Sequence, residues 1–204
     1  MNNLPFDTVY LAADEVQALE DAYKALKSKF NISLPGADAH INKFEQFNNE
    51  QEAKISGTFL INHPTIDCYL TFVKIHYDFT AGKTNLKYWK CQAWAFVNLK
   101  QDFGRVLIRR ETFADKILSL VHPTELKFKD DKVFSDHFYV VTNDPEKATA
   151  AMTPDFRKVI IDMMYKDFVI EIINKTLVIR NNQPINTDDT VHLAELASKI
   201  ASVG

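Results

Sequence analysis

The sequence has few of the residues that would indicate a small disulfide-bonded, loop-rich or membrane-embedded protein. Only two of its 204 residues are cysteine, which excludes a disulfide framework. Five glycines and seven prolines are too few for a chain made mainly of loops. No apolar run approaches the roughly 20 residues that a membrane-spanning helix requires. The start, Met1-Asn2-Asn3, lacks the charged and apolar regions of a signal peptide. We therefore expect a soluble, cytoplasmic protein.

The chain also lacks an excess of positive charge. Its formal net charge is −3, which gives no general attraction to nucleic acid or to anionic lipid. The basic clusters are short, Lys27-Ser28-Lys29 and Arg109-Arg110, and both are typical of a solvated surface. Nucleic acid is therefore not an expected partner.

Motifs for nucleotide, metal or acyl-transfer chemistry are missing as well. The five glycines are too far apart to form a GxGxxG or phosphate-binding loop, and no GxSxG turn occurs. The six histidines are scattered and show neither zinc-finger nor HExxH spacing. His76 and Asp78 would share one face of a strand, where an ordinary hydrogen bond is the expected role. The sequence thus identifies no catalytic residue, no metal ligand and no cofactor.

What the chain does contain is apolar and aromatic mass. The hydrophobic fraction is 46%, with 15 Phe, 7 Tyr and 2 Trp, enough for a packed core. Strand patterns follow one another rather than alternating with helices, which favours an α+β fold. We expect an antiparallel sheet of about six to nine strands with helices packed on it. One domain spanning 1–204 is the first expectation, and subdomains 1–121 and 122–204 are the alternative.

Periodicity and end signals place the elements along the chain. Helices are expected at 12–30, 111–121, 145–152, from 154 onward and at 187–203. Strands are expected at 7–11, 54–62, 66–79, 86–100, 105–109, 134–142, 168–173 and 176–179. Residues 37–52 are polar and amide-rich, and the sequence does not determine their structure.

The two longest strands form a hairpin if the turn is centred on 80–85. Pairing Phe79 with Leu86 then separates two faces, one uniformly apolar and one mixed and strongly aromatic. The mixed face carries the candidate binding residues Tyr69, Tyr77, Tyr88, Trp94 and Phe96. Two interpretations stay open. Either the first helix or the polar segment after it covers this face, or the face is a groove for an apolar ligand or a protein partner.

The same register predicts the state of the cysteines. Cys68 and Cys91 lie on the apolar face but are not opposite each other, so they are too far apart for a disulfide. Two buried free thiols fit a reducing compartment.

The stretch from Phe134 to Met164 has the clearest local pattern, a strand followed by two helices that begin at Asp144-Pro145 and Thr153-Pro154. It resembles the DUF3137 family of bacterial proteins of unknown function over roughly 104–179. The matching residues fit the family pattern F-x-V-x-S/T-x-D…A…L-T-P: Phe138, Val140, Thr142, Asp144, Ala148, Thr153 and Pro154. The chain departs from the pattern at Lys147 and Thr149, where the family more often has an acidic and a basic residue. The resemblance implies no activity and no catalytic residues.

These observations favour a non-catalytic binding or scaffold module that uses the aromatic sheet face. Its partner would be a protein or an apolar small molecule. An enzyme whose site is not readable from sequence is one alternative, and a structural subunit of a homo-oligomer is another.

Overall fold

The computed structural model describes the chain except residues 1–3, 35–52, 63–67, 82–83, 111–122 and 182, and for 79–81 and 84–85 it describes the backbone alone. The helix expected at 111–121 lies outside the described residues, as does the undetermined stretch 37–52. Within the described part the protein has the α+β architecture predicted from the sequence. No described helix is both long enough and apolar enough to span a bilayer.

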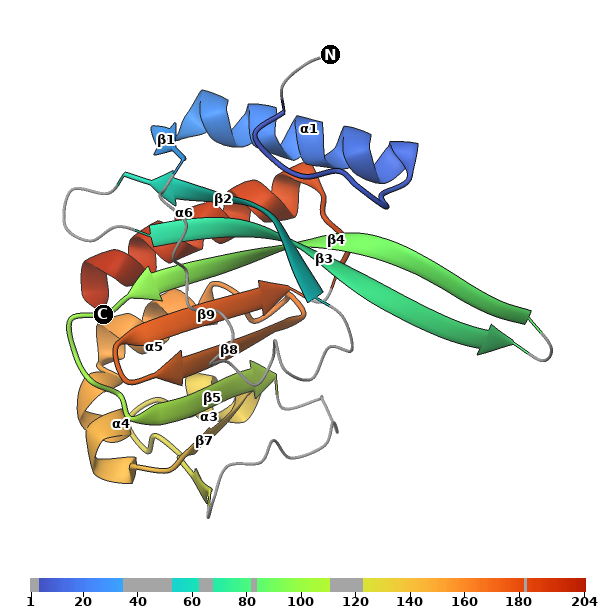
Figure 1. Ribbon diagram of the computed structural model, residues 1–204. Helices are drawn as coiled ribbons and strands as arrows, with labels where there is room; N and C mark the ends of the chain where they lie inside the picture. The colour runs from blue at the N-terminus through green and yellow to red at the C-terminus, as the bar shows by residue number, and fades with distance from the viewer. Residues whose placement is uncertain (1–3, 35–52, 63–67, 82–83, 111–122, 182) are drawn as a thin grey trace.

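One antiparallel sheet of nine strands forms the centre of the protein, in the order β1-β2-β3-β4-β9-β8-β5-β7-β6 (Figure 1). The strands of the first half are β1 (Ile32–Ser33), β2 (Ala53–Ile61), β3 (Cys68–Ala81) and β4 (Thr84–Asn98). Those of the second half are β5 (Arg105–Arg110), β6 (Thr124–Glu125), β7 (Phe138–Thr142), β8 (Phe168–Ile173) and β9 (Thr176–Asn181). The C-terminal hairpin β8–β9 lies in the middle of the sheet, between β4 and β5, and joins the two halves.

The predicted register of the long hairpin is confirmed. Phe79 pairs with Leu86, and the pairing continues without a shift to Cys68 opposite Val97. The distal part of β3 and β4 projects from the body as a two-stranded arm (Figure 1), because β2 accompanies β3 only as far as the pair Ala53–Ile75.

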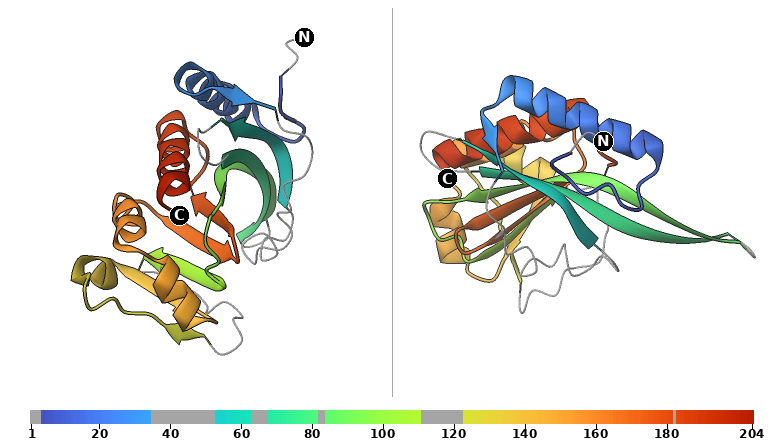
Figure 2. Two further views of the ribbon diagram at one scale, coloured as in Figure 1. Left: turned by 90° about the vertical axis from the view of Figure 1, so that its left-hand side faces the viewer. Right: turned by 45° about the horizontal axis from the view of Figure 1, so that its top comes forward.

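The five described helices cover one face of this sheet (Figure 2). They are α1 (Ala13–Lys29), α3 (Lys132–His137), α4 (Pro145–Ala151), α5 (Pro154–Ile161) and α6 (Thr187–Val203). Every one of them contributes buried residues to a single main core, together with the apolar face of the hairpin. Leu19 and Leu26 of α1 are completely buried there, as the helical stripe in the sequence predicts.

For the stretch 134–164, the prediction of two helix starts is confirmed, and the prediction of where the strand begins is wrong. Asp144 and Thr153 cap α4 and α5, accepting hydrogen bonds from the amides of Lys147 and Phe156. The strand expected at 134–142 begins only at Phe138, since the preceding residues form α3. The Asp131 side chain accepts a hydrogen bond from the Phe134 amide and starts that short helix.

The strand expected at 7–11 is also absent; this segment instead makes turns against the β2–β3 part of the sheet. Asp7 and Ser56 exchange hydrogen bonds, and the ammonium of the buried Lys74 forms an ion pair with the Asp7 carboxylate. Phe6 packs directly over Gly57, where a Cβ would lie 2.8 Å from the Phe6 Cβ. The absence of a side chain at Gly57 is therefore what lets the segment approach the sheet.

Candidate functional site

The sheet face opposite the helices carries all five candidate binding residues. Tyr69 pairs with Phe96, Tyr77 pairs with Tyr88, and Trp94 lies between these pairs on β4. The buried members of this face form a second hydrophobic cluster, separate from the main core: Val73, Ile75, Trp94, Phe96 and Val178. All of the cluster's described members come from strands, so the described helices do not contribute to it.

This arrangement rules out one of the two covers expected for the aromatic face. The first helix packs on the opposite side of the sheet, where Tyr23 contacts Phe6 and Phe59 with ring centroids 5.8 and 5.1 Å apart. The physical reason is that this side of the sheet is uniformly apolar, so covering it with helices removes more apolar surface from water than covering the mixed face would. The other expected cover, the polar segment 37–52, lies outside the described residues.

The five residues differ strongly in exposure. Trp94 is completely buried and Phe96 is 4% exposed, whereas Tyr88 on the arm is 41% exposed. Tyr69 and Tyr77 are half-buried. The aromatic face therefore changes from a filled cluster at the centre of the sheet to an accessible surface along the arm.

A chain of hydrogen bonds joins these two parts. The Trp94 indole donates to Gln92 Oε1 at 3.0 Å, and Gln92 Nε2 donates to the Tyr77 hydroxyl at 3.1 Å. Tyr77 in turn stacks on Tyr88, with centroids 5.5 Å apart and an interplanar angle of 12°. The buried Trp94 indole and Gln92 amide thus have hydrogen-bond partners, and stacking on Tyr77 orients the Tyr88 ring on the arm.

The opposite face of the arm has an aromatic group of its own at its base. Tyr10 is 67% exposed and stacks on Trp89 at 5.9 Å. The Lys54 ammonium lies 4.9 Å from the Trp89 ring centroid, and His76 contacts the same ring. His76 and Asp78 share a face as expected, but His76 Nε2 lies 3.6 Å from Asp78 Oδ1, longer than the expected hydrogen bond between them. Sequence reasoning missed Tyr10, because it assigned residues 7–11 to a strand.

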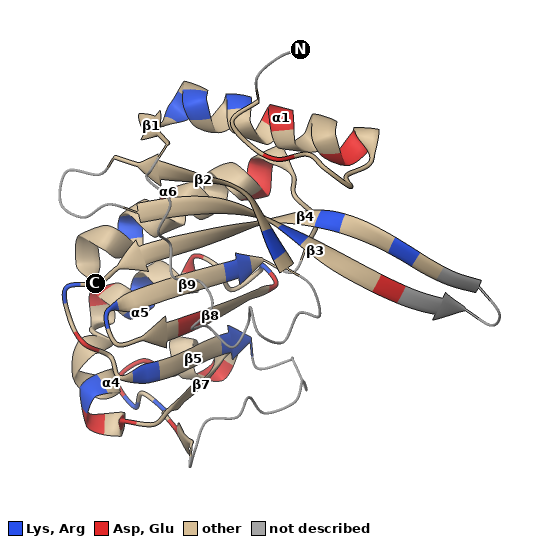
Figure 3. Cartoon of the chain, viewed as in Figure 1, with Lys and Arg blue, Asp and Glu red and all other residues tan. Residues whose placement is uncertain are grey.

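Arginines form a further feature of the sheet face opposite the described helices, and sequence reasoning missed them. Arg105 donates to Glu171 at 3.0 Å, and Glu171 is almost completely buried on β8. The Arg109 guanidinium lies 4.8 Å from the Tyr139 ring centroid, and the Arg180 guanidinium lies 5.6 Å from that of Trp94. Figure 3 shows the basic segments on β5 and β9. Strand alternation alone places Arg105 and Arg109 on one face, but their neighbours depend on the strand order of the folded sheet.

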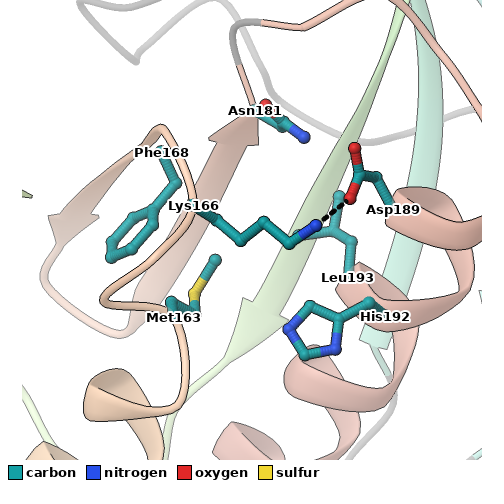
Figure 4. Close-up of a pocket in the computed structure, with 7 residues that line it drawn as sticks. All are labelled: Met163, Lys166, Phe168, Asn181, Asp189, His192 and Leu193. Atoms are coloured by element: carbon teal, nitrogen blue, oxygen red, sulfur yellow. Dashed lines mark hydrogen bonds and ion pairs between the residues drawn. The ribbon is translucent and has the colours of Figure 1, made fainter.

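Two hollows lie outside this face, and neither has the form of an active site. The first, of about 10 Å³, holds no more than one water molecule and is lined by residues around the Lys166–Asp189 ion pair of 2.6 Å (Figure 4). Burial raises the pKa of Asp189, but hydrogen bonds from Asn186 and Lys166 outweigh it and leave that pKa below its ordinary value.

The second hollow, of about 370 Å³, is a surface depression beside α3. Its lining is lysine-rich: Lys127, Phe128, Lys129, Lys132, Ser135 and Asp136. Lys127 is already engaged by Glu125 at 2.9 Å. The depression therefore offers exposed charge and no converging set of buried polar groups.

The described residues also bring no catalytic or metal-binding constellation together. Among them, no group of three or more His, Cys, Asp or Glu side chains could hold a metal ion. Cys68 and Cys91 are buried and form no disulfide, as predicted from the register. Burial, followed by the charge of Glu15, raises the pKa of the Cys91 thiol far above its ordinary value. Such a thiol is a poor nucleophile.

Comparisons with known proteins agree with the fold and do not establish a family. No family model matches the chain, so the DUF3137 resemblance stays a prediction, and no curated protein matches either. A solved structure does match: the mycobacterial trehalose monomycolate transport factor A, TtfA. The alignment covers 94% of this chain and 95% of TtfA, with a TM-score of 0.59 and 6% sequence identity. The two proteins share a fold. At this identity the likeness extends to the fold alone.

Proposed function

We propose that this protein is a non-catalytic binding module that takes an apolar ligand at the aromatic sheet face. The observation that carries the proposal is the distribution of the helices. All described helices lie on one side of the sheet, while the other side continues, through a hydrogen-bonded aromatic series, onto an arm with accessible rings. Tyrosine and tryptophan suit such a surface because each combines a large apolar area with a polar group.

The fold comparison supports a binding role of this kind. TtfA is described as a transport factor, and this chain shares its fold over nearly the full length of both chains. By analogy, we propose that this protein takes part in moving or presenting an apolar molecule rather than in transforming it.

Residues on the arm provide the test. A neutral apolar fluorophore, N-phenyl-1-naphthylamine, should bind to the purified protein, and Tyr88→Ser should weaken that binding severalfold. Tyr165→Ser is the matched control, because Tyr165 is 81% exposed and is not part of the aromatic face. Equal binding by both variants, or no binding by the wild type, would contradict the proposal.

Native mass spectrometry of gently purified protein gives a second, independent readout. A small added mass that Tyr88→Ser removes would support the apolar ligand. A protein adduct lost in the same variant would instead indicate a scaffold role for this face. A homo-oligomer unaffected by the substitution would favour the structural-subunit alternative.

A further inference from the structure

The arm carries aromatic rings on both of its faces at one level. Tyr77 pairs with Tyr88, and the next pair along the hairpin is His76 with Trp89. Adjacent pairs point to opposite faces and lie only about 3.4 Å apart along the strands. On one face Tyr77 stacks on Tyr88, and on the other Trp89 contacts His76 and Tyr10 with ring centroids 5.0 and 5.9 Å away. These five residues form an aromatic belt around the two-stranded ribbon: Tyr10, His76, Tyr77, Tyr88 and Trp89.

The aromatic belt is accessible, unlike the second hydrophobic cluster. Tyr10 is 67% exposed and Tyr88 is 41% exposed. Leu86, which lies beyond Tyr88 toward the hairpin turn, is 53% exposed, and Val9, the residue before Tyr10, is 55% exposed. These four make up half of the eight large apolar side chains that are exposed in the described part of the chain. Such a concentration of exposed apolar surface marks an interaction site.

Lysines border the aromatic belt. The ammonium groups of Lys90 and Lys54 lie 5.7 and 4.9 Å from ring centroids of the belt. Lys87 is exposed on the arm, 3.7 Å from Asp78, the single carboxylate among the arm's described side chains (Figure 3). Three lysines therefore face one aspartate here, although the whole chain has a net charge of −3. The arm is locally basic and complements an anionic surface.

This combination of residues is the one found where a bilayer meets water. Tyrosine and tryptophan rings lie at the level of the lipid headgroups, and lysine stems run beside them while the ammonium groups reach phosphate and water. A folded protein partner would pack on one face of the arm, whereas a fluid layer of headgroups can surround rings on both faces. We propose that the arm docks this protein on the surface of an anionic lipid bilayer, with the aromatic belt at headgroup level.

The strand edges of the arm set the depth of insertion. Among the described strands, β2 accompanies β3 only to the pair Ala53–Ile75, and β9 accompanies β4 only to the pair Trp94–Arg180. An open sheet edge does not enter hydrocarbon, because its backbone groups would have no hydrogen-bond partner there. The arm therefore stops in the headgroup layer.

Docking deepens the proposed function and rests on it in one respect: the bilayer would be the source or the destination of the apolar ligand, because Tyr77 and Tyr88 belong both to the aromatic sheet face and to the aromatic belt. Attachment to the bilayer itself needs no ligand, so it can be measured alone.

Sedimentation with vesicles is the first measurement. The protein should bind vesicles of phosphatidylcholine and phosphatidylglycerol, bind pure phosphatidylcholine vesicles at least about tenfold more weakly, and be released by high salt. Leu86→Ser should weaken binding to the mixed vesicles severalfold, because it removes apolar surface that enters the headgroup layer. Val133→Ser is the matched control, since Val133 on α3 is also 53% exposed, and it should bind within about twofold of the wild type.

A pair of charge variants tests the lysines. One lysine near an anionic leaflet contributes about fivefold in affinity, so Lys87→Gln combined with Lys90→Gln should weaken binding to the mixed vesicles about 30-fold. Lys129→Gln combined with Lys132→Gln makes the same change of charge at two exposed lysines beside α3, away from the arm, and should leave binding within about twofold. Equal losses in the two double variants would show general attraction of lysines to the vesicles and would overturn docking by the arm.

Quenching by brominated phosphatidylcholine in the mixed vesicles reports where the arm lies. Tryptophan emission should be quenched in the wild type and not in Trp89→Phe, because Trp94 is completely buried in the protein. Sedimentation without quenching would show adsorption without insertion of the aromatic belt and would overturn its placement at headgroup level. All of these substitutions are at exposed or half-buried positions, so thermal unfolding should give Tm values within about 2 °C of the wild type.

The neutral fluorophore keeps the two proposals apart when it is added without vesicles. The double variant of Lys87 and Lys90 should still bind it, since its binding needs no charge. A wild-type protein that binds the fluorophore but not the mixed vesicles would overturn docking alone. One that binds the mixed vesicles but not the fluorophore would contradict the apolar-ligand site and support docking.

Discussion

Replacing Arg157 with methionine tests how much a buried arginine with three hydrogen-bond partners stabilises the helical layer. Arg157 is 4% exposed on α5. Its Nε donates to Asp131 at 3.1 Å, Nη2 to Asp130 at 2.5 Å and Nη1 to the Met152 carbonyl at 2.9 Å. The guanidinium also lies 4.4 Å from the Phe128 ring centroid. One side chain thus ties the turn before α3 to the end of α4.

The cost of Arg157→Met can be worked out from what each partner loses. Met152 is completely buried, so its carbonyl oxygen would be left without the hydrogen bond that Arg157 donates, at a cost of about 1–3 kcal/mol. Loss of the contact with Phe128 adds about 0.5–1 kcal/mol. Asp130 is 65% exposed and Asp131 19% exposed at the side chain, so water can solvate both, and their ion pairs contribute about 0–1 kcal/mol. Methionine retains most of the apolar packing, so we expect the total loss to be the sum of these contributions, about 1.5–5 kcal/mol.

Urea unfolding followed by circular dichroism measures this difference as a shift of the midpoint at constant slope. Lys158→Met is the matched control, because it makes the same change at the next residue, which is exposed, and it should stay within about 0.5 kcal/mol of the wild type. Replacing a buried ion pair by an apolar residue is neutral in some proteins. An Arg157→Met protein as stable as the Lys158→Met control would therefore refute the reasoning that the Met152 carbonyl depends on this arginine.

Two further predictions concern the N-terminal segment. The hydrogen bond from Lys74, helped by the Val9 amide, lowers the pKa of Asp7 from its ordinary 3.8. A carboxylate with a lowered folded-state pKa stabilises the fold above the unfolded value and loses this contribution as the pH falls through the folded pKa. Asp7→Asn should therefore lower the Tm at pH 7, and the difference from wild type should shrink below pH 4; a constant difference across the titration would refute the linkage. Gly57→Ala places a Cβ 2.8 Å from the Phe6 Cβ and should cost about 1–3 kcal/mol in urea unfolding. The double variant with Phe6→Gly, which removes the clashing Cβ, should lose less than the sum of the two single changes, whereas strict additivity would show that the contact is not the cause.

Sequence patterns predicted the parts of the fold whose interactions are local. The hairpin register followed from one turn and strict alternation, and it is confirmed from Phe79–Leu86 to Cys68–Val97. The caps at Asp144 and Thr153 were recognisable because a capping side chain and its amide are three residues apart. These features need no knowledge of which strands neighbour which.

Two kinds of error have clear physical causes. Phe134 and Phe138 are four residues apart, a spacing that fits one face of a strand and also one face of a helix. The sequence pattern was therefore ambiguous. In the structure Phe134 lies in the helix α3, which the Asp131 side chain stabilises by accepting a hydrogen bond from the Phe134 amide. The ring neighbours of the arginines were out of reach for a different reason. Arg109 lies over Tyr139 because β5 pairs with β7, and Arg180 lies over Trp94 because β9 pairs with β4, and neither pairing of strands distant in the sequence can be read from local patterns.

The exposure of the aromatic face narrows where on it a ligand can bind. Trp94 and Phe96 were predicted as part of a binding surface, but they are almost fully buried and already have neighbours within the second hydrophobic cluster. If the proposed ligand binds at this face, its contacts come mainly from the arm, where Tyr88 is 41% exposed. The pairing of β4 with β9 ends at Trp94 and Arg180, so Arg180 lies where the arm leaves the body of the sheet. An apolar ligand that lies along Tyr77 and Tyr88 would bury the exposed rings of the arm without displacing any member of the filled cluster, so substitutions on the arm should affect binding more directly than substitutions of Trp94 or Phe96.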